Sequence, residues 1–300
     1  LRYHMMHDHV LRFRSVMAEA VRQRYDARRT TGLFLSGGLD SGSICALLAE
    51  ESALLNQPVY TYTAVPAYPE ELSEQVLRVA DESAYAQRYE EVYPHVVHSA
   101  LSFKGDAVVS NHIHLRIEDV FYPVINKNTF WLNGILRMAK ERGVERMFQG
   151  QTGNYTISWN APRDRSGMDS RSARIDILSR TMTFTGMRWY QDGLLAGVEV
   201  VEPTVDNRLL RHSLSISEEC FHYKGEQKYI VREAMKGLVP EVIRVSQQVF
   251  FQSCDFIAHL KRDTAAMKNS GDEFFTEDAA RVREELIRYS VHLFKSAKKK

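Results

Sequence analysis

The sequence predicts an α/β fold with a doubly wound parallel sheet, followed by a mostly helical C-terminal lobe. A glycine-rich turn at residues 36–41 joins a strand-like apolar run to a helix-like apolar run. Strand-like and helix-like segments then alternate up to about residue 160. This alternation is typical of a parallel sheet that carries helices on both faces. Beyond residue 160, helical patterns dominate and convincing strands are few.

The individual elements follow from the spacing of apolar residues. Residues 8–25 carry apolar side chains at helical spacing, and Gly32–Leu35 reads as a buried strand that leads into the turn. We expect the helix after the turn to start near Gly42. The same reasoning predicts strands at 58–64, 95–98 and 144–148, helical segments at 69–88 and 128–142, and a loop at 160–172.

Composition describes an ordinary globular protein. Of its 300 residues, 44% are hydrophobic and 26% are charged, which is enough for a sizeable core. The balance of 39 basic against 38 acidic residues leaves a net charge of +1. This balance gives no reason to expect a nucleic-acid or membrane surface. Three cysteines without ligand spacing and the lack of a signal peptide fit a reducing, cytoplasmic compartment.

The turn Ser36-Gly37-Gly38-Leu39-Asp40-Ser41 is the strongest functional signal. Two adjacent glycines let several backbone N–H groups point into one small volume, and such a nest at a helix N-terminus binds phosphate. The serine hydroxyls add donors, and Asp40 could hold a Mg²⁺ ion that bridges phosphates. The spacing differs from the Walker loop, because no Lys follows the last glycine. The alternative is an ordinary strand-to-helix turn that binds nothing.

Further candidate residues come from three other places in the chain. The loop 149–154, with Gly150 and Gly153, follows a predicted strand, so we expect it to face the same crevice as the first turn. Lys228 and Arg232 stand four apart in a predicted helix, 225–236. They form either a cationic stripe for departing pyrophosphate or a solvated basic face. Asp81 lines the crevice or is solvated.

Together these residues resemble the synthetase domain of class B asparagine synthetase and its relatives, the β-lactam synthetases and lasso-peptide cyclases. These enzymes belong to the ATP pyrophosphatases. The likeness covers nearly all the chain, and its motifs occur in the family's order. The residues that carry it are Ser36–Ser41, Asp81-Glu82 with Ala84, Asn126, Trp131, Ala139, Gly150–Asn154, Pro203, Asp206, Arg208, Lys228, Arg232 and Gln252–Phe256.

The resemblance implies an adenine nucleotide alpha hydrolase-like fold of the pyrophosphate-loop type. Residues 1–160 would be the nucleotide-binding part and residues 161–300 the helical substrate lobe, and the glutaminase domain usual in the family is absent from these residues. Phe34 and Ala64 would flank adenine. The full set of implied positions comprises Phe34, Leu35, Ser36, Gly37, Gly38, Leu39, Asp40, Ser41, Ala64, Asp81, Gln149 and Gly150 for ATP, Asp40 and Asn154 for Mg²⁺, and Lys228, Arg232 and Gln151 for catalysis.

The implied reaction activates a carboxylate with ATP, releases pyrophosphate and forms an amide as AMP leaves. Members that make asparagine carry a Glu, an Asp and a Lys where this sequence has Gln151, Asn154 and Gln248. We therefore favour a lasso-type peptide macrolactam cyclase over asparagine synthetase. A degenerate homologue that binds nucleotide or peptide without turnover is the third alternative. The expected partners are a peptide or a small carboxylate, with a leader-peptide-binding protein or a protease left open.

Overall fold

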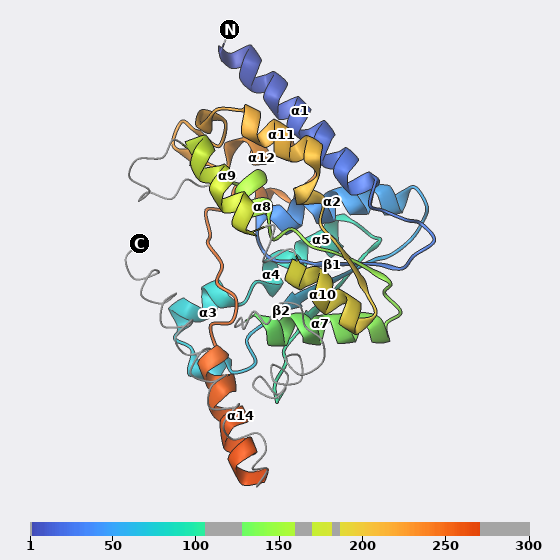
Figure 1. Cartoon of the computed structure of the whole chain (residues 1–300), viewed down its shortest axis with the longest axis vertical. Coiled ribbons are helices and arrows are strands. Elements are labelled where there is room, and N and C mark those ends of the chain that lie inside the picture. The colour runs from blue at the N-terminus through green and yellow to red at the C-terminus, as the bar shows by residue number, and fades with distance from the viewer. Residues whose placement is uncertain (1, 106–127, 160–169, 182–186, 271–300) are drawn as a thin grey trace. The chain divides into compact units, whose positions relative to one another are not determined.

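The computed structural model in Figure 1 describes residues 2–105, 128–159, 170–181 and 187–270. Asn126 and the first ten residues of the loop predicted at 160–172 lie outside these ranges. No helix in the described ranges combines the length and the apolar character that a membrane crossing needs.

A five-stranded parallel sheet forms the centre of the fold, in the order β3-β2-β1-β4-β5. Thr31 of β1 lies beside Val59 of β2 on one side and Arg146 of β4 on the other. Because β1 is central, all four of its residues are buried, as expected for a strand covered on both faces. The predicted α/β class is thus confirmed. The strands are β1 (Thr31–Phe34), β2 (Val59–Ala64), β3 (Val96–Leu101), β4 (Arg146–Phe148) and β5 (Glu199–Val201).

Helices precede, separate and follow the strands, and a two-stranded hairpin comes late in the chain. The α-helices are α1 (Arg2–Arg22), α2 (Leu39–Ala53), α3 (Glu74–Ala80), α4 (Ser83–Ala86), α5 (Arg88–Val92), α7 (Thr129–Glu141), α8 (Gly153–Thr156), α9 (Ser170–Thr181), α10 (Met187–Ala196), α11 (Asn207–Ser215), α12 (Tyr229–Ala234), α13 (Glu241–Arg244) and α14 (Phe256–Ser270). The 3₁₀ turns are Pro69–Glu71, Pro203–Val205 and Glu218–Cys220, and the hairpin strands are β6 (His222–Tyr223) and β7 (Glu226–Gln227).

Alternation along β1 explains how helices cover both faces of the sheet. Leu33 and Leu35 belong to the core cluster that includes residues of α1 and α2. Phe34 lies between them in sequence, so its side chain points to the opposite face, where its ring meets Trp189 of α10. In Figure 1, α1 and α2 accordingly lie on one side of the sheet and α10 on the other.

The chain packs into two compact units, each assembled from three stretches. Unit 1 comprises residues 1–63, 83–99 and 139–248, and unit 2 comprises 64–82, 100–138 and 249–300. The division near residue 160 into a nucleotide-binding part and a helical lobe stays a prediction. Strand β5 lies beyond that position and joins the sheet beside β4, in a stretch for which the sequence indicated mainly helix.

Unit 1 has a core that joins α1 to the sheet and to the later helices. Phe13 and Met17 of α1 are fully buried in the same cluster as Leu33 of β1 and Ile230 of α12. The helix is amphipathic because these apolar side chains recur three to four residues apart. It therefore covers the outer surface of α2 and α12 with one face.

Unit 2 is organised around the start of α14. The Asp255 carboxylate accepts hydrogen bonds from the backbone N–H groups of Ala67, at 2.6 Å, and Tyr68, at 3.2 Å. The ring of His259, one turn later, lies against the rings of Tyr68 and Phe130. These contacts fix the chain after β2 to α14, and they give Asp255 a structural role within unit 2.

Candidate functional site

The turn between β1 and α2 has the geometry of an anion-binding loop. Helix α2 begins at Leu39, and its N-cap residue Gly38 makes no side-chain hydrogen bond. The first N–H groups of a helix have no partner within the helix, and no side chain at the N-cap bonds to those of α2. The partial positive charge of the helix N-terminus favours phosphate there. The predicted strand–turn–helix arrangement is present.

The two serines of this turn hold it closed. Their hydroxyl oxygens lie 2.8 Å apart, and the backbone N–H of Ser36 donates to the Ser41 hydroxyl at 2.9 Å. The Gly38 N–H donates to the Ser36 hydroxyl at 3.2 Å. The sequence suggested both hydroxyls as donors to phosphate, whereas here they also bond to the turn itself. The hydroxyl groups of Ser36 and Ser41 thus stabilise the conformation of the turn.

Asp40 lies in the first turn of α2. One of its carboxylate oxygens accepts a hydrogen bond, and the other accepts none from the described residues. Its Oδ2 accepts a hydrogen bond from the Ser158 hydroxyl at 2.8 Å. Its Oδ1 is buried and has no hydrogen-bond partner among the described residues. Burial raises the pKa of Asp40, while the charge of Lys228 and the bond from Ser158 lower it. A buried carboxylate oxygen without a partner is costly, and it is a natural place for a cation.

The second glycine loop packs directly on this aspartate. A Cβ atom on Gly153 would lie 2.8 Å from the Asp40 Cβ and 3.1 Å from its open Oδ1. A Cβ on Gly150 would lie 2.9 Å from the Ile44 side chain and 3.5 Å from the Ser41 backbone nitrogen. Only glycine leaves room for so close an approach. The structure thus brings the two predicted loops together, as their positions after neighbouring strands suggested.

Most backbone N–H groups of the second loop are already bonded within the protein. Those of Gln149 and Gly153 donate to the carbonyls of Val201 and Gly150, each at 3.0 Å. Those of Gln151 and Thr152 donate to the side chains of Gln149 and Glu202. We therefore regard this loop as the wall that supports Asp40. The predicted contact of Gln149 and Gly150 with nucleotide stays a prediction.

Three residues predicted beside the nucleotide lie in the core of unit 1. Leu35 and Leu39 are both 3% exposed, and Phe34 is 7% exposed. The Phe34 ring packs edge-on against Trp189, with the centroids 4.9 Å apart. Sequence reasoning missed Trp189, because nothing local places α10 against the end of β1. The predicted part of Phe34, Leu35 and Leu39 in binding nucleotide stays a prediction.

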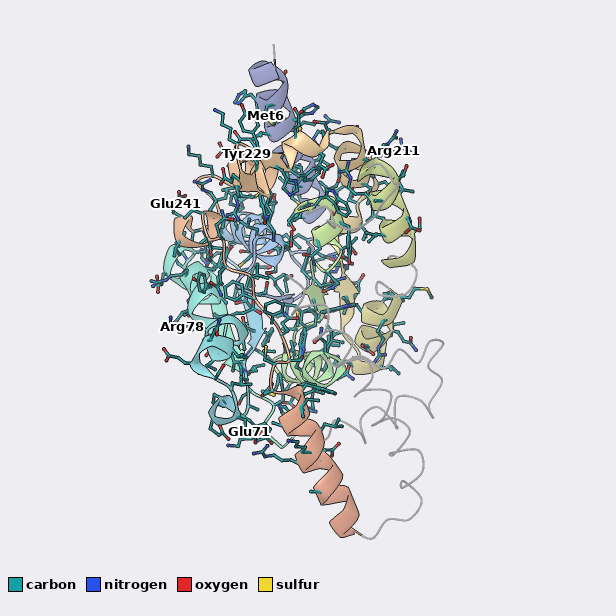
Figure 2. All side chains as sticks on the ribbon, turned by 90° about the vertical axis from the view of Figure 1, so that its left-hand side faces the viewer. Met6, Glu71, Arg78, Arg211, Tyr229 and Glu241 are labelled. Atoms are coloured by element: carbon teal, nitrogen blue, oxygen red, sulfur yellow. The ribbon has the colours of Figure 1, made fainter. Side chains whose placement is uncertain are left out.

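Lys228 and Arg232 do not share a helix face, which corrects the prediction of a helix from residue 225. Figure 2 marks Tyr229, where α12 begins. Lys228 is its N-cap, in the left-handed region at φ 60°, directly after the β6–β7 hairpin. Its charge lowers the pKa of Asp40. Lys228 therefore keeps its candidate role in binding anions.

Arg232 has a different environment from the predicted cationic stripe. It is 3% exposed, and its guanidinium donates to three backbone carbonyls: those of Gln227 at 2.8 Å, Ser246 at 2.8 Å and Arg244. With its donors used in this way, Arg232 anchors the chain that leads to Gln248. Its predicted role in catalysis stays a prediction.

The three positions where a charge is replaced lie at the surface. Gln151, Asn154 and Gln248 are all exposed. The Asn154 amide donates to the Gln151 carbonyl at 3.4 Å. No cluster of three His, Cys, Asp or Glu residues suited to a metal occurs in the described part of the chain. The predicted part of Asp40 and Asn154 in holding Mg²⁺ stays a prediction.

Ala64 and Asp81 belong to unit 2. Ala64 is the last residue of β2, and Asp81 is the exposed residue that ends α3. The neighbouring Glu82 is 2% exposed, which disagrees with a solvated pair. Their predicted part in binding nucleotide stays a prediction.

Two other motif residues form a structural pair. The Asp206 carboxylate receives the Arg208 side chain at 2.9 Å and that of Arg24 at 2.9 Å. These bonds, that from Arg208 first, lower the pKa of Asp206. Asp206 also caps the N-terminus of α11, so it ties the end of α1 to α11. These contacts explain the pair structurally.

The fold and this site define a class of protein. A parallel α/β sheet with a glycine turn after its central strand, and a second glycine loop after the neighbouring strand, is the architecture of an α/β nucleotide-binding protein. Sequence comparison then shows the family: the asparagine synthase family matches residues 12–158 and 171–286. The chain belongs to the asparagine synthase family.

A relative from Schizosaccharomyces pombe is described as a probable glutamine-hydrolysing asparagine synthetase. It is 27% identical over 286 residues, which cover 87% of this chain and 50% of the relative. The chain thus spans about half the length of that curated protein.

Proposed function

We propose that this chain is an ATP-dependent ligase that activates a carboxylate as its adenylate and converts it into an amide. The observation that carries the proposal is the turn at 36–41, where the N-terminus of α2 adjoins the buried Oδ1 of Asp40, an atom with no hydrogen-bond partner among the described residues. Membership of the asparagine synthase family supports it. Lys228, whose charge reaches Asp40, would offset the negative charge of the phosphates.

The proposed reaction has two steps. A carboxylate oxygen of the substrate attacks the α-phosphorus of ATP, the bond to the β-phosphate breaks, and pyrophosphate leaves. An amine nitrogen then attacks the activated carbonyl carbon and AMP leaves with the bonding electrons, while the amine gives up a proton. The N–H groups at the start of α2 would stabilise the departing pyrophosphate, since preorganised donors act where negative charge builds up.

The residues present fit a single Mg²⁺ ion. Mg²⁺ is commonly held by one or two carboxylates together with the phosphates of the substrate. Asp40 offers one carboxylate, with its Oδ1 open and its Oδ2 oriented by Ser158. When bound, the ion would neutralise phosphate charge. Asn154 would supply a neutral oxygen at most, which fits a site completed mainly by phosphate and water.

We infer that the substrate is one peptide that is closed into a macrolactam, as in the lasso-type cyclases. Gln151 is exposed and neutral, and an amide side chain cannot take a proton from an incoming amine. General-base assistance is worth roughly 10²–10⁴-fold. A peptide amine held beside its own activated carboxylate has an effective molarity on the order of 10⁵ M or more. An intramolecular reaction therefore tolerates the loss of the base better than one between two free molecules.

Incubation with Mg·ATP and a candidate precursor peptide tests the proposal. We expect AMP and pyrophosphate by chromatography, and a peptide that has lost one water by mass spectrometry. Asp40→Asn should abolish both products. If ADP were the main nucleotide product, the adenylation mechanism would be wrong.

The runner-up activity is asparagine formation from aspartate and ammonia, which the name of the yeast relative favours. We expect it to be poor in the natural chain and to rise in Gln151→Glu, which restores an acid at the loop. Efficient asparagine formation by the unmodified chain would overturn the choice of a peptide substrate. Binding of Mg·ATP without any release of AMP would favour the third alternative, a homologue that binds without turnover.

A further inference from the structure

Glu202 is a partly buried residue directly after β5, and its carboxylate accepts hydrogen bonds from neutral donors. One carboxylate oxygen, Oε1, accepts hydrogen bonds from the Thr152 backbone N–H at 2.5 Å and from the Thr204 hydroxyl at 2.7 Å. The other oxygen, Oε2, accepts one from the side-chain amide of Gln149. Burial raises the pKa of Glu202, and these bonds oppose that rise. Such a group is costly to bury unless every bond is made.

The contacts of Glu202 extend through Gln149 to a second position in the loop. The Gln149 side chain uses its nitrogen to donate to Glu202 and its oxygen to accept the Gln151 N–H at 2.8 Å. One carboxylate thus fixes the loop twice, directly at Thr152 and through Gln149 at Gln151. We use the name Glu202 clamp for the four residues Glu202, Gln149, Gln151 and Thr152.

The clamped residues lie beside and between the two glycines that touch Asp40. Gly150 packs on the backbone of Asp40 and Ser41, and Gly153 packs on the Asp40 side chain beside its open Oδ1. A shift of the loop by a few tenths of an ångström would therefore move the wall against which Asp40 is held. Catalytic groups must be held to about half an ångström to work.

We propose that Glu202 is a positioning residue that holds the second glycine loop against Asp40, and so sets the geometry of the phosphate site. The role in the phosphate site rests on the proposed function, whereas the clamp itself does not. A carboxylate suits position 202 because each of the three groups bonded to it donates a hydrogen bond. A glutamine there would turn an N–H group toward one of these donors, so one of the links would be lost.

A reciprocal exchange gives the sharpest test of the clamp. In the double variant Glu202→Gln/Gln149→Glu, the new amide oxygen at position 202 can still accept from Thr152 and Thr204. The new amide nitrogen can donate to the new carboxylate at position 149, whose second oxygen accepts the Gln151 N–H. The exchange therefore restores every hydrogen bond of the clamp. Donor and acceptor are reversed only in the bond between positions 149 and 202. Glu199→Gln is the matched control, since Glu199 lies in β5, close by in sequence, but pairs with Arg146 and Arg29.

Amide hydrogen exchange on the full chain measures the clamp without nucleotide. Losing a hydrogen bond worth about 1 kcal/mol should speed exchange at Gln151 and Thr152 by about five- to tenfold in Glu202→Gln. The reciprocal exchange should restore slow exchange, and Glu199→Gln should leave these two amides unchanged. Unchanged exchange in Glu202→Gln, or no recovery in the double variant, would overturn the clamp.

Calorimetry with Mg·ATP then tests the link to the phosphate site. We expect binding to weaken at least about tenfold in Glu202→Gln and to recover in the double variant. Faster amide hydrogen exchange in the loop with unchanged affinity for ATP would show that the loop does not position the phosphate site. This result would overturn the role of Glu202 in that site. If the natural chain itself failed to bind Mg·ATP, the proposed function would be wrong, while the clamp would still be decided by hydrogen exchange.

Discussion

Asp40 illustrates how a single buried carboxylate can lower stability, which its proposed role in the phosphate site would explain. Its pKa is raised in the folded chain because burial disfavours the charged form. A raised pKa means that the folded state holds the proton more tightly than the unfolded chain does. The stabilisation linked to that proton is present below the ordinary pKa of an aspartate, about 4. It is lost as the pH rises through the raised value.

We therefore expect Asp40→Asn to increase the free energy of unfolding at pH 7 and to change it little at pH 3. The same variant should bind Mg·ATP at least about tenfold more weakly, a loss of about 1.4 kcal/mol. Urea denaturation at the two pH values and calorimetry with Mg·ATP measure the two effects. Asp26→Asn is the control and should lower the free energy of unfolding at pH 7. The reason is that a hydrogen bond from Arg28 lowers the pKa of Asp26 to about 2. A drop in stability at pH 7 in Asp40→Asn would contradict the argument.

At the residue scale, the sequence indicated that Asp40 belongs to the site but not which side chains surround it. Asp40 could be predicted because it lies inside a six-residue motif with its own local geometry. Ser158 could not, because it reaches Asp40 through the fold from 118 positions along the chain. Glu202 lies further still along the chain, and its place between a β-rich run and Pro203 was its only local hint.

Helix α2 shows how closely an element must be fitted around the glycine turn. Its Gly42 lies against Tyr89 of α5, and a Cβ there would come within 2.1 Å of the tyrosine hydroxyl. That hydroxyl is buried and has no hydrogen-bond partner among the described residues. Because Gly42 has no side chain, the ring of Tyr89 can lie directly against α2. This contact determines the distance between α2 and α5.

We expect Gly42→Ala to lower the free energy of unfolding by about 1–3 kcal/mol, as overpacking does. Tyr89→Phe removes the hydroxyl and should be close to neutral, because it deletes a buried polar group that makes no bond within the described part of the chain. The double variant should recover most of the loss, since the next atom, the ring Cζ, is 3.1 Å away. Urea denaturation of all four proteins gives the coupling energy. Simple additivity of the two changes would exclude a clash between these residues.

Arg232 gives a second prediction at the scale of elements. Its guanidinium joins α12 to the chain after α13 by donating to three carbonyls. Arg232→Met keeps much of the volume but leaves those buried acceptors without donors, which costs about 1–3 kcal/mol for each unsatisfied group. We therefore expect a loss of at least about 2 kcal/mol in the free energy of unfolding, measured by urea denaturation.

The control for this prediction is Arg211→Met on α11, an exposed residue that Figure 2 labels. It should change stability by less than about 0.5 kcal/mol. Arg232→Lys separates charge from geometry, because lysine keeps the charge but not the planar set of donors. Full stability in Arg232→Lys would show that charge alone matters, and would favour the cationic stripe expected from the sequence.

Elements with a strong local signal were predicted closely, and those with a weak signal were not. The strands expected at 58–64 and 95–98 correspond to β2 and β3, and the helix expected at 128–142 corresponds to α7. Strand β5 has only three residues, too few to show alternation. The start of α12 was misplaced because Glu226 and Gln227 pair with β6, and such pairing depends on tertiary context.

At the scale of the whole molecule, the α/β class and the meeting of the two glycine loops could be read from the sequence. The reason is that parallel strands place their following loops at one edge of the sheet. The grouping of three separate stretches into each unit could not be predicted, because it depends on contacts between residues far apart in the chain. Helix α1 belongs to unit 1 through such contacts, and its buried face gives the last prediction.

Phe13→Ala should lower the free energy of unfolding by about 3–5 kcal/mol, the usual cost of removing a buried aromatic side chain. Phe13 is fully buried in the core cluster that also contains Leu33 of β1 and Ile230 of α12. The loss should therefore appear in the unfolding of the sheet and the helices together. Leu11→Ala is the matched control, because Leu11 lies on the same helix but is 53% exposed. It should cost less than about 0.5 kcal/mol.

Binding of ligand should offset part of this loss, because a ligand that binds only the folded state stabilises it whichever residue has been changed. Mg·ATP at about one hundred times its dissociation constant should add about 2.7 kcal/mol to the stability of the folded state. Thermal unfolding of Phe13→Ala with and without Mg·ATP measures this gain, and adding Asp40→Asn to the same chain should remove about half of it or more. Equal losses in Phe13→Ala and Leu11→Ala would mean that α1 does not contribute to the core. A gain that survived Asp40→Asn would place the nucleotide away from the glycine turn.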